Sequence, residues 1–275
     1  MDLEKLNETP SPPPRQLPPR SVRQARSPSP PPTEGSARMV VSEVLAAETV
    51  MSLPVPYYEH DGITIYHGDC REILSKLHFT AMLTDPPYNV SLGSQQHGTN
   101  RKKEYVSHYD SLGIGDYQHL IDAITKYAIT VPSLITCGNS NQAYWPIPKW
   151  TMAWTKLNGI TRTPLTRGQK MNHSCWEPIL VYGKLEYPPR SDVFNVSISV
   201  QADVDGHPCP KPLKLWTKLV SCFADDAIIL DPFMGSGTTL RAAKDLRRKA
   251  IGIEIEEKYC EIAANRLSQE VLDFT

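Results

Sequence analysis

Hydrophobic and polar positions follow one another along the chain with two different periods. Short apolar runs predict buried strands, whereas apolar residues three and four apart, as at Leu213, Trp216 and Val220, predict helices. The expected strands are 63–67, 80–84, 133–137, 151–154, 179–182, 227–230 and 250–254. The expected helices are 71–77, 117–130, 211–223, 238–248 and 256–271. Because strands alternate with helices, this pattern predicts an α/β fold with a largely parallel sheet covered on both faces.

The N-terminal segment has a different composition. Ten of the 25 prolines fall within residues 10–32, among serines and arginines. Such a segment cannot bury enough apolar surface to offset the entropy lost on ordering. We therefore expect a disordered tail at 1–38, a transition segment at 39–56 and a single domain at 57–275. Alternatively, the tail is a ligand for a proline-binding module, or its arginines contact phosphate.

Charge and cysteine content exclude several classes of protein. The 29 basic and 30 acidic residues nearly cancel, so overall basicity does not drive binding to nucleic acid. The longest uncharged stretch, 127–148, contains three prolines and a polar run, and we expect no membrane contact. The six cysteines lie far apart without a Cys-x-x-Cys pair, and the histidines lack metal-ligand spacing. We therefore expect an intracellular, cytoplasmic protein without a metal.

A glycine-containing turn near the C-terminus is the first candidate site. An apolar strand at 227–230 leads into Asp-Pro-Phe-Met-Gly-Ser-Gly-Thr-Thr (231–239), which opens a helix. Gly235 and Gly237 let the backbone approach a ligand closely, and the free N–H groups of the helix start can bind it. Glu254 ends the next strand, where a carboxylate can accept hydrogen bonds from ribose hydroxyls. Together these features predict a site for a nucleoside-containing cofactor.

A proline-containing turn is the second candidate site. The apolar strand at 80–84 ends in Asp85-Pro86-Pro87-Tyr88. Proline fixes its own φ, so its carbonyl is a rigid acceptor. An exocyclic amine on an aromatic ring needs two acceptors and a surface for stacking, and Asp85, a proline carbonyl and Tyr88 supply them. A turn that merely ends the strand is the alternative.

These segments resemble the signatures of amino-DNA methyltransferases that use S-adenosylmethionine. Supporting matches are His67-Gly-Asp69-Cys-Arg, His207-Pro-Cys-Pro-Lys211-Pro and Ile251-Gly-Ile-Glu254. The resemblance covers about residues 60–270. A catalytic motif that precedes the cofactor loop is similar to the circularly permuted β subgroup. The resemblance implies a Rossmann-like class I fold with a mixed, mostly parallel seven-stranded sheet.

The resemblance also implies site residues and the cofactor S-adenosylmethionine. Glu254 would bind the ribose, Asp69 the adenine amine, and the turn from Gly235 the methionine part. The implied catalytic residues are Asp85, Pro86, Pro87 and Tyr88. The implied cofactor-binding residues are Asp69, Cys70, Lys211, Pro212, Asp231, Phe233, Gly235, Ser236, Gly237, Thr238, Thr239 and Glu254.

The implied reaction is direct methyl transfer to the amine of a base flipped out of double-stranded DNA. Asp85, in place of serine, favours adenine N6 over cytosine N4. Cys209 has no Pro-Cys-Gln setting, so it is interpreted as structural and no covalent nucleophile is expected. An RNA substrate stays open. A non-catalytic nucleic-acid-binding subunit is the other alternative, but we would expect such a chain to have lost Asp85, Tyr88 or the glycines.

Two basic segments are candidates for contact with nucleic acid. Arg101, Lys102 and Lys103 follow the catalytic turn within 89–109, and Arg162, Arg167 and Lys170 form a second set. Solvated loops are the alternative for both. The interval 185–206, where a target-recognition region is expected, has only 22 residues, which predicts a short recognition site or help from another subunit. A prokaryotic or phage-infected cell is expected; a homodimer and a cognate restriction endonuclease stay open.

Overall fold

The structure is a computed structural model that describes residues 53–88, 112–156, 161–163, 172–198 and 211–269. For 161–163 and 172–174 it describes the backbone alone. These residues lie in one compact unit, Met51–Thr275. Within the described ranges, no helix is long and apolar enough to cross a bilayer.

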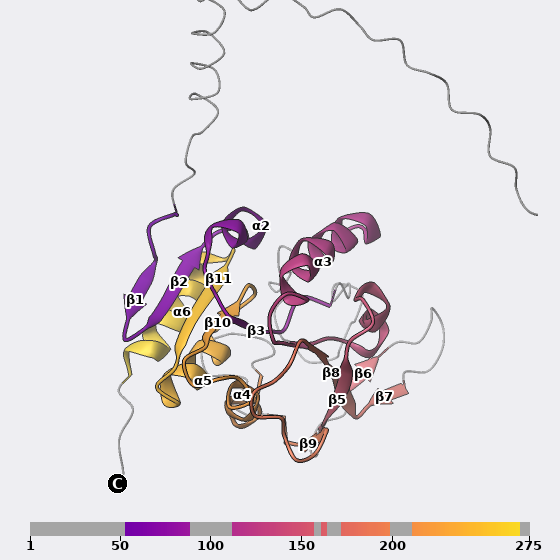
Figure 1. The fold of residues 1–275 in the computed structure, drawn as a ribbon. Helices are drawn as coiled ribbons and strands as arrows, with labels where there is room; N and C mark the ends of the chain where they lie inside the picture. Colours follow the sequence, from indigo (N-terminus) through magenta and orange to yellow (C-terminus); the bar gives the residue numbers. More distant parts are fainter. Residues whose placement is uncertain (1–52, 89–111, 157–160, 164–171, 199–210, 270–275) are drawn as a thin grey trace, which may run out of the picture. The chain divides into compact units, whose positions relative to one another are not determined.

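A nine-stranded sheet forms the centre of this unit, with the strand order β1-β2-β11-β10-β3-β4-β8-β5-β9 (Figure 1). Neighbours from β2 to β4 pair in parallel, whereas β8 runs antiparallel to both β4 and β5. The strand bounds are β1 Tyr58–His60, β2 Ile63–His67, β3 Ala81–Thr84, β4 Ser133–Thr136, β5 Trp150–Thr155, β8 Trp176–Tyr182, β9 Val193–Asn195, β10 Ile228–Asp231 and β11 Lys249–Glu254. A separate antiparallel pair consists of β6 Thr161–Thr163 and β7 Asn172–Ser174.

Helices pack on both faces of the sheet (Figure 1). Their bounds are α2 Cys70–Ile73, α3 Ile114–Ala128, α4 Leu213–Val220, α5 Thr238–Asp245 and α6 Glu257–Ser268, with short 3-10 turns η1 Leu74–Lys76 and η3 Asn139–Tyr144. One apolar cluster joins the sheet to α4, α5 and α6, and the other joins it to α2 and α3. In α4, Leu215, Trp216, Leu219 and Val220 are buried, one stripe at helical spacing.

The predicted mixed, mostly parallel α/β fold is confirmed, but the predicted number of strands is too low. All seven expected strands lie in the large sheet, and β1 and β9 extend it at its two ends. Neither added strand has an apolar run: β1 is half-buried to exposed, and β9 buries only Phe194. Strands of three residues with at most one buried side chain give no pattern that sequence periodicity can detect. The expected helix near 42–50 lies outside the described residues.

The parallel strands bring all candidate chemistry to one edge of the sheet. Asp69 follows β2, Glu254 ends β11, Asp231 ends β10 and Asp85 follows β3. From β10 the chain continues to β11 on one side, and from β3 it continues to β4 on the other side. The boundary between β10 and β3 is therefore a topological switch point, where α/β sheets of this kind bind ligands.

Candidate active site

The glycine turn after β10 brings backbone without covering side chains to this edge of the sheet. Gly235 has φ 50° and Gly237 has φ 77°, both in the left-handed region that glycine tolerates. Gly237 is the N-cap of α5 and supplies no side-chain cap, so the helix begins with free N–H groups. A Cβ at Gly237 would lie 2.8 Å from the Cβ of Ala263. Close packing of α5 against α6 thus adds to the requirement for glycine.

Glu254 holds the turn from the neighbouring strand. Its Oε2 accepts a hydrogen bond from the Gly235 N–H at 3.0 Å, and its Oε1 accepts one from the Glu256 N–H at 2.9 Å. Burial raises the pKa of Glu254 to about 7, even though these hydrogen bonds favour the ionised form. The carboxylate is therefore poorly solvated, and each of its oxygens can accept a further hydrogen bond.

Asp69 lies beside Glu254 but is engaged locally. The Gly68 N–H donates to the Glu254 carbonyl at 2.9 Å, which joins the ends of β2 and β11. Asp69 caps α2 by accepting from the Arg71 N–H, and it forms an ion pair with the Arg71 guanidinium. Cys70, also predicted to bind cofactor, is instead 1% exposed in the apolar core, where burial raises the pKa of its thiol to about 12. Its assignment to the cofactor site stays a prediction, while its thiol packs in the apolar core.

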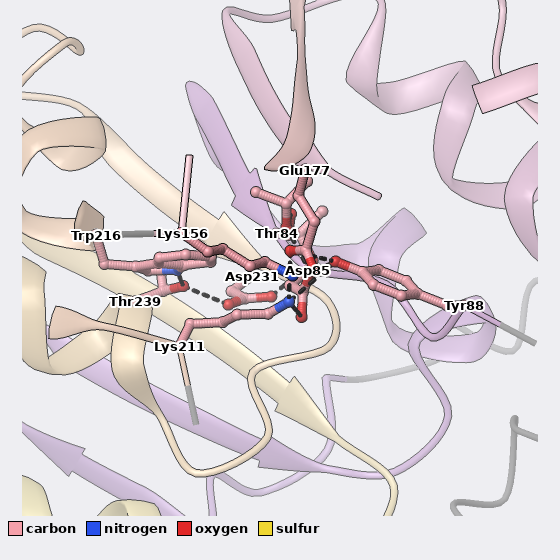
Figure 2. A network of polar contacts seen from close by, with 10 residues as sticks. Thr84, Asp85, Tyr88, Lys156, Glu177, Lys211, Trp216, Asp231 and Thr239 are labelled. Carbon is pink, nitrogen blue, oxygen red and sulfur yellow. Dashed lines mark hydrogen bonds and ion pairs between the residues drawn. The ribbon is translucent and has the colours of Figure 1, made fainter. Parts of the chain in front are cut away.

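A chain of buried hydrogen bonds connects the glycine turn to the proline turn (Figure 2). The Trp216 indole donates to Thr239 Oγ1 at 2.9 Å, and the Thr239 hydroxyl donates to Asp231 Oδ2 at 2.5 Å. The Thr84 hydroxyl donates to Asp231 Oδ1 at 2.7 Å, and Thr84 is the residue before Asp85. Asp231 is 3% exposed, and burial raises its pKa to about 6.

Asp231 and Thr239 therefore lie beneath the turn rather than at its surface. Both were predicted to contact the cofactor, but Thr239 is only 1% exposed and its hydroxyl is used within the chain of hydrogen bonds. Their contact with the cofactor stays a prediction, while their hydrogen bond holds the turn from below. Ser236 and Thr238 are also buried, and the Ser236 carbonyl accepts from Arg266 at 2.7 Å.

Asp85 is held by three side chains from different elements. Its Oδ1 accepts from the Thr136 hydroxyl at 2.5 Å and from the Tyr88 hydroxyl at 2.8 Å. Its Oδ2 lies 2.8 Å from the Lys211 ammonium. Burial raises the pKa of Tyr88 well above its usual value, and the nearby carboxylates raise it further, so the hydroxyl remains a donor.

Lys156 and Glu177, which the sequence motifs did not indicate, complete this charge cluster. Figure 2 shows Lys156 and Lys211 reaching toward the same carboxylates, which Tyr88 approaches from the other side. Glu177 is 7% exposed; its Oε1 lies 2.5 Å from Lys156 Nζ, and its Oε2 lies 3.4 Å from Lys211 Nζ. Burial alone would raise the pKa of Glu177, but the two ammonium groups outweigh it and lower the pKa. Both carboxylates are thus compensated by lysine.

The backbone of the proline turn is fixed by two further side chains. The Tyr117 hydroxyl of α3 donates to the Pro87 carbonyl at 2.9 Å, and the Asn141 amide donates to the Tyr88 carbonyl at 2.7 Å. Beside them, a Cβ at Gly138 would lie 2.8 Å from Asn141 Oδ1 and 3.3 Å from the Tyr88 ring. The ring and its carbonyl are therefore closely packed, which limits motion of the turn.

Most of the predicted site residues lie at the same edge of the sheet, and among them Lys211 contacts the proline turn. Lys211, predicted to bind cofactor, has its ammonium in the cluster around Asp85, while Pro212 is buried as the N-cap of α4. Phe233 is partly buried, and its N–H donates to Asp231 at 3.1 Å. The side chains of the predicted nucleic-acid-binding residues lie outside the described part of the chain; they are Arg101, Lys102, Lys103, Arg162, Arg167 and Lys170. Cys209 also lies outside it.

Comparison with known proteins agrees with this arrangement. The DNA methylase family model N6_N4_Mtase matches residues 139–265. The Type II methyltransferase M.ScaI of Streptomyces caespitosus is 27% identical over 270 residues, covering 82% of this chain and 87% of that protein. M2.DpnII of Streptococcus pneumoniae, also a Type II methyltransferase, is 26% identical over 259 residues, covering 78% of this chain and 93% of that protein.

A solved structure gives the same result. The crystal structure of the M1.HpyAVI–SAM complex superposes with a TM-score of 0.53 at 26% identity, covering 75% of this chain and 100% of that one. Over these ranges the chain is similar to the amino-DNA methyltransferases. That solved structure is a complex with S-adenosylmethionine (SAM).

The residues at this edge of the sheet fit that ligand chemically. Glu254 offers carboxylate oxygens suited to hydroxyl and amine donors, whereas both oxygens of Asp69, at the adjacent strand end, accept from Arg71. The free N–H groups at the start of α5 suit a carboxylate. The left-handed backbone at Gly235 and Gly237 leaves no side chain between that helix start and a ligand. Among the described residues, no group of three His, Cys, Asp or Glu side chains is arranged to hold a metal.

Proposed function

We propose that this protein transfers a methyl group from S-adenosylmethionine to the N6 amine of adenine in double-stranded DNA. The single observation that carries this proposal is the hydrogen bond of 2.7 Å between Thr84 and Asp231. It joins β3, which Asp85 follows, to β10, which leads into the glycine turn. A methyl donor bound at the turn and an amine bound at Asp85 would therefore be neighbours, as direct transfer requires.

The base site that we infer consists of Asp85, Pro86 and Tyr88. Asp85 and the Pro86 carbonyl would accept the two N–H bonds of the amine, and the Tyr88 ring would stack on the base. In a duplex the amine is paired and stacked, so the base must be flipped out to reach these groups. The support from Tyr117 and Asn141 keeps the acceptors in place before the base arrives, which reduces the reorganisation needed in the transition state.

The contribution of Asp85 to the chemical step is electrostatic. When bound, S-adenosylmethionine supplies a methyl group activated by a positively charged sulfur. As the amine nitrogen forms its bond to carbon, it becomes positive and must lose one proton. A carboxylate hydrogen-bonded to that nitrogen stabilises the positive charge and lies where it can accept the proton. Glu254, Asp69 and the glycine turn would hold the cofactor through its ribose, adenine and methionine parts.

The choice of adenine rests on the identity of the first residue in the proline turn. Asp85 is an aspartate, which offers a charged acceptor to the amine, whereas serine would offer a weaker neutral one. Cytosine also carries an exocyclic amine beside a ring nitrogen, so cytosine N4 is the second outcome that the experiment must separate.

Incubation of the full chain with S-adenosylmethionine and unmethylated double-stranded DNA, followed by mass spectrometry of the nucleosides, tests this function. We expect N6-methyladenine. N4-methylcytosine would overturn the choice of base while keeping the reaction, and product on RNA alone would overturn the choice of polymer. The absence of methylated nucleosides from both polymers would overturn the proposed activity.

A further inference from the structure

The Lys211 ammonium occupies a position like that of the target amine. It lies 2.8 Å from Asp85 Oδ2 and donates to the Tyr88 hydroxyl at 2.9 Å. It also lies 4.9 Å from the centroid of the Tyr88 ring. An N–H donor bonded to Asp85 is what the proposed base site would accept from the substrate, and the ammonium lies at the hydroxyl end of the Tyr88 ring.

The hydrogen bonds of Asp85 direct Lys211 and the incoming amine to the same oxygen. Oδ1 accepts from both Thr136 and Tyr88, which uses both of its lone pairs. The incoming amine is left with Oδ2, where Lys211 is bound. An ammonium at this distance would also oppose the positive charge that develops on the amine nitrogen, because like charges repel strongly where water is excluded.

Glu177 provides a second anion within reach of the same ammonium. Its Oε2 lies 3.4 Å from Lys211 Nζ, so a small displacement exchanges one carboxylate for the other. Its Oε1 is held by Lys156, whose side chain is only 4% exposed. Lys156 fixes the orientation of Glu177 and keeps Oε2 directed at Lys211.

We propose that Lys211 occupies the amine position while the site is empty and moves from Asp85 to Glu177 when the target base enters. Glu177 is then a positioning residue: it withdraws a positive charge from Asp85 and leaves the Asp85 carboxylate for the cationic transition state. This inference rests on the proposed base site at Asp85.

Removal of the Glu177 charge, alone and together with the Lys211 ammonium, tests the inference. We expect Glu177→Gln to slow single-turnover methylation by about a hundredfold at saturating DNA and cofactor, because Lys211 then stays on Asp85. Adding Lys211→Met to Glu177→Gln removes the competitor, and we expect it to restore the rate by about tenfold or more over the single variant. A double variant no faster than Glu177→Gln overturns the inference, as does a Glu177→Gln rate equal to that of the unaltered chain.

Lys211→Met alone provides a second test if Glu177→Gln does not fold. We expect a lower KM for DNA and an unchanged Kd for S-adenosylmethionine by calorimetry, since the competitor for Asp85 is gone. A weakened cofactor Kd, or a raised KM for DNA, overturns the inference, because Lys211 would then serve the cofactor or the DNA directly. Lys214→Met, at an exposed lysine of the same helix, is the matched control. If the unaltered chain transfers no methyl group, the proposed function fails; if it does and the variants behave otherwise, the inference alone fails.

Discussion

The two halves of the site contain carboxylates in opposite electrostatic settings. On the cofactor side, Glu254 and Asp231 accept hydrogen bonds from neutral amides and hydroxyls, and burial raises the pKa of both. On the catalytic side, Lys211 and Lys156 surround Glu177 and lower its pKa. Among the described residues, neither Glu254 nor Asp231 forms an ion pair, whereas Asp69 pairs with Arg71. The carboxyl oxygens of Glu254 therefore suit a ligand that brings hydrogen-bond donors. On the catalytic side, two lysines already balance the carboxylate charges before any ligand binds.

The difference shows where each half obtains its specificity. A carboxylate without a cation gains most from the arrival of donors, so the cofactor side is completed by its ligand. A carboxylate that already has a cation must exchange it, so the catalytic side discriminates between competing donors. The following experiments act on one half or on the bond between them.

Replacement of Asp85 by alanine has the largest expected effect. We expect methylation to fall by about a thousandfold or more, because an acceptor for the positive nitrogen is lost. The Kd for S-adenosylmethionine, measured by calorimetry, stays within about twofold if the two halves bind independently. Asp192→Ala, at an exposed aspartate, is the control. Full activity of Asp85→Ala would contradict the catalytic role, and a lost cofactor Kd would contradict independence of the halves.

Replacement of Asp231 by alanine breaks the bond between the halves. The Thr84 and Thr239 hydroxyls and the Phe233 N–H all donate to this carboxylate and would be left without it. We expect the free energy of unfolding to fall by about 3 kcal/mol and both cofactor affinity and rate to fall with it. Urea titration measures the first, with Asp226→Ala at an exposed aspartate as control. A free energy of unfolding equal to that of the control would show that the buried chain of hydrogen bonds does not stabilise the fold.

Replacement of Gly237 by alanine acts on the cofactor half alone. The residue would keep φ 77° and bring its Cβ within 2.8 Å of Ala263. We expect a loss of about 1.5 kcal/mol in unfolding free energy together with a weaker Kd for S-adenosylmethionine. Gly115→Ala in α3, where no atom lies within 4 Å of the added Cβ, is the matched control and is expected to be neutral or stabilising. Equal effects of the two substitutions would refute the backbone argument.

The smallest expected effect is a pH dependence of stability from Glu254. Its pKa rises from 4.5 to about 7 on folding, so the native state binds more protons than the unfolded chain between these values. The contribution of this group is therefore fully present below pH 4.5 and is lost as the pH rises through 7. We expect Glu254→Gln to flatten that part of the profile of unfolding free energy, whereas Glu257→Gln, at an exposed glutamate, leaves it unchanged. An unaltered profile in Glu254→Gln would mean that its carboxyl is not desolvated.

The sequence predicts well what depends on neighbours in the chain. The apolar runs that predicted seven strands, and the turns at 85–88 and 235–239, have local signals: burial of a run, fixed φ in proline, free φ in glycine. Parallel strands then bring these turns to one edge without further information.

Contacts between distant segments could not be predicted in this way. Glu177 is the second residue of β8, which runs antiparallel to its neighbours, and it meets Tyr88 across 89 positions of the chain. A glutamate before an apolar run has no local feature to distinguish it from a solvated one, since only the packing of β8 between β4 and β5 buries it. Lys211 carries a motif signal, but the position of its ammonium against Asp85, 126 residues away, is a property of the folded chain. The buried roles of Cys70 and Thr239 are likewise set by tertiary packing.

The hydrogen bond between Thr84 and Asp231 also affects how such enzymes can diverge. In the proposed reaction, it sets the distance between the methyl donor and the target amine from inside the core. Residues that choose the base, or the sequence around it, can therefore be exchanged without altering how far a methyl group travels. The choice of the methylated base can therefore change while the geometry of the methyl transfer stays the same.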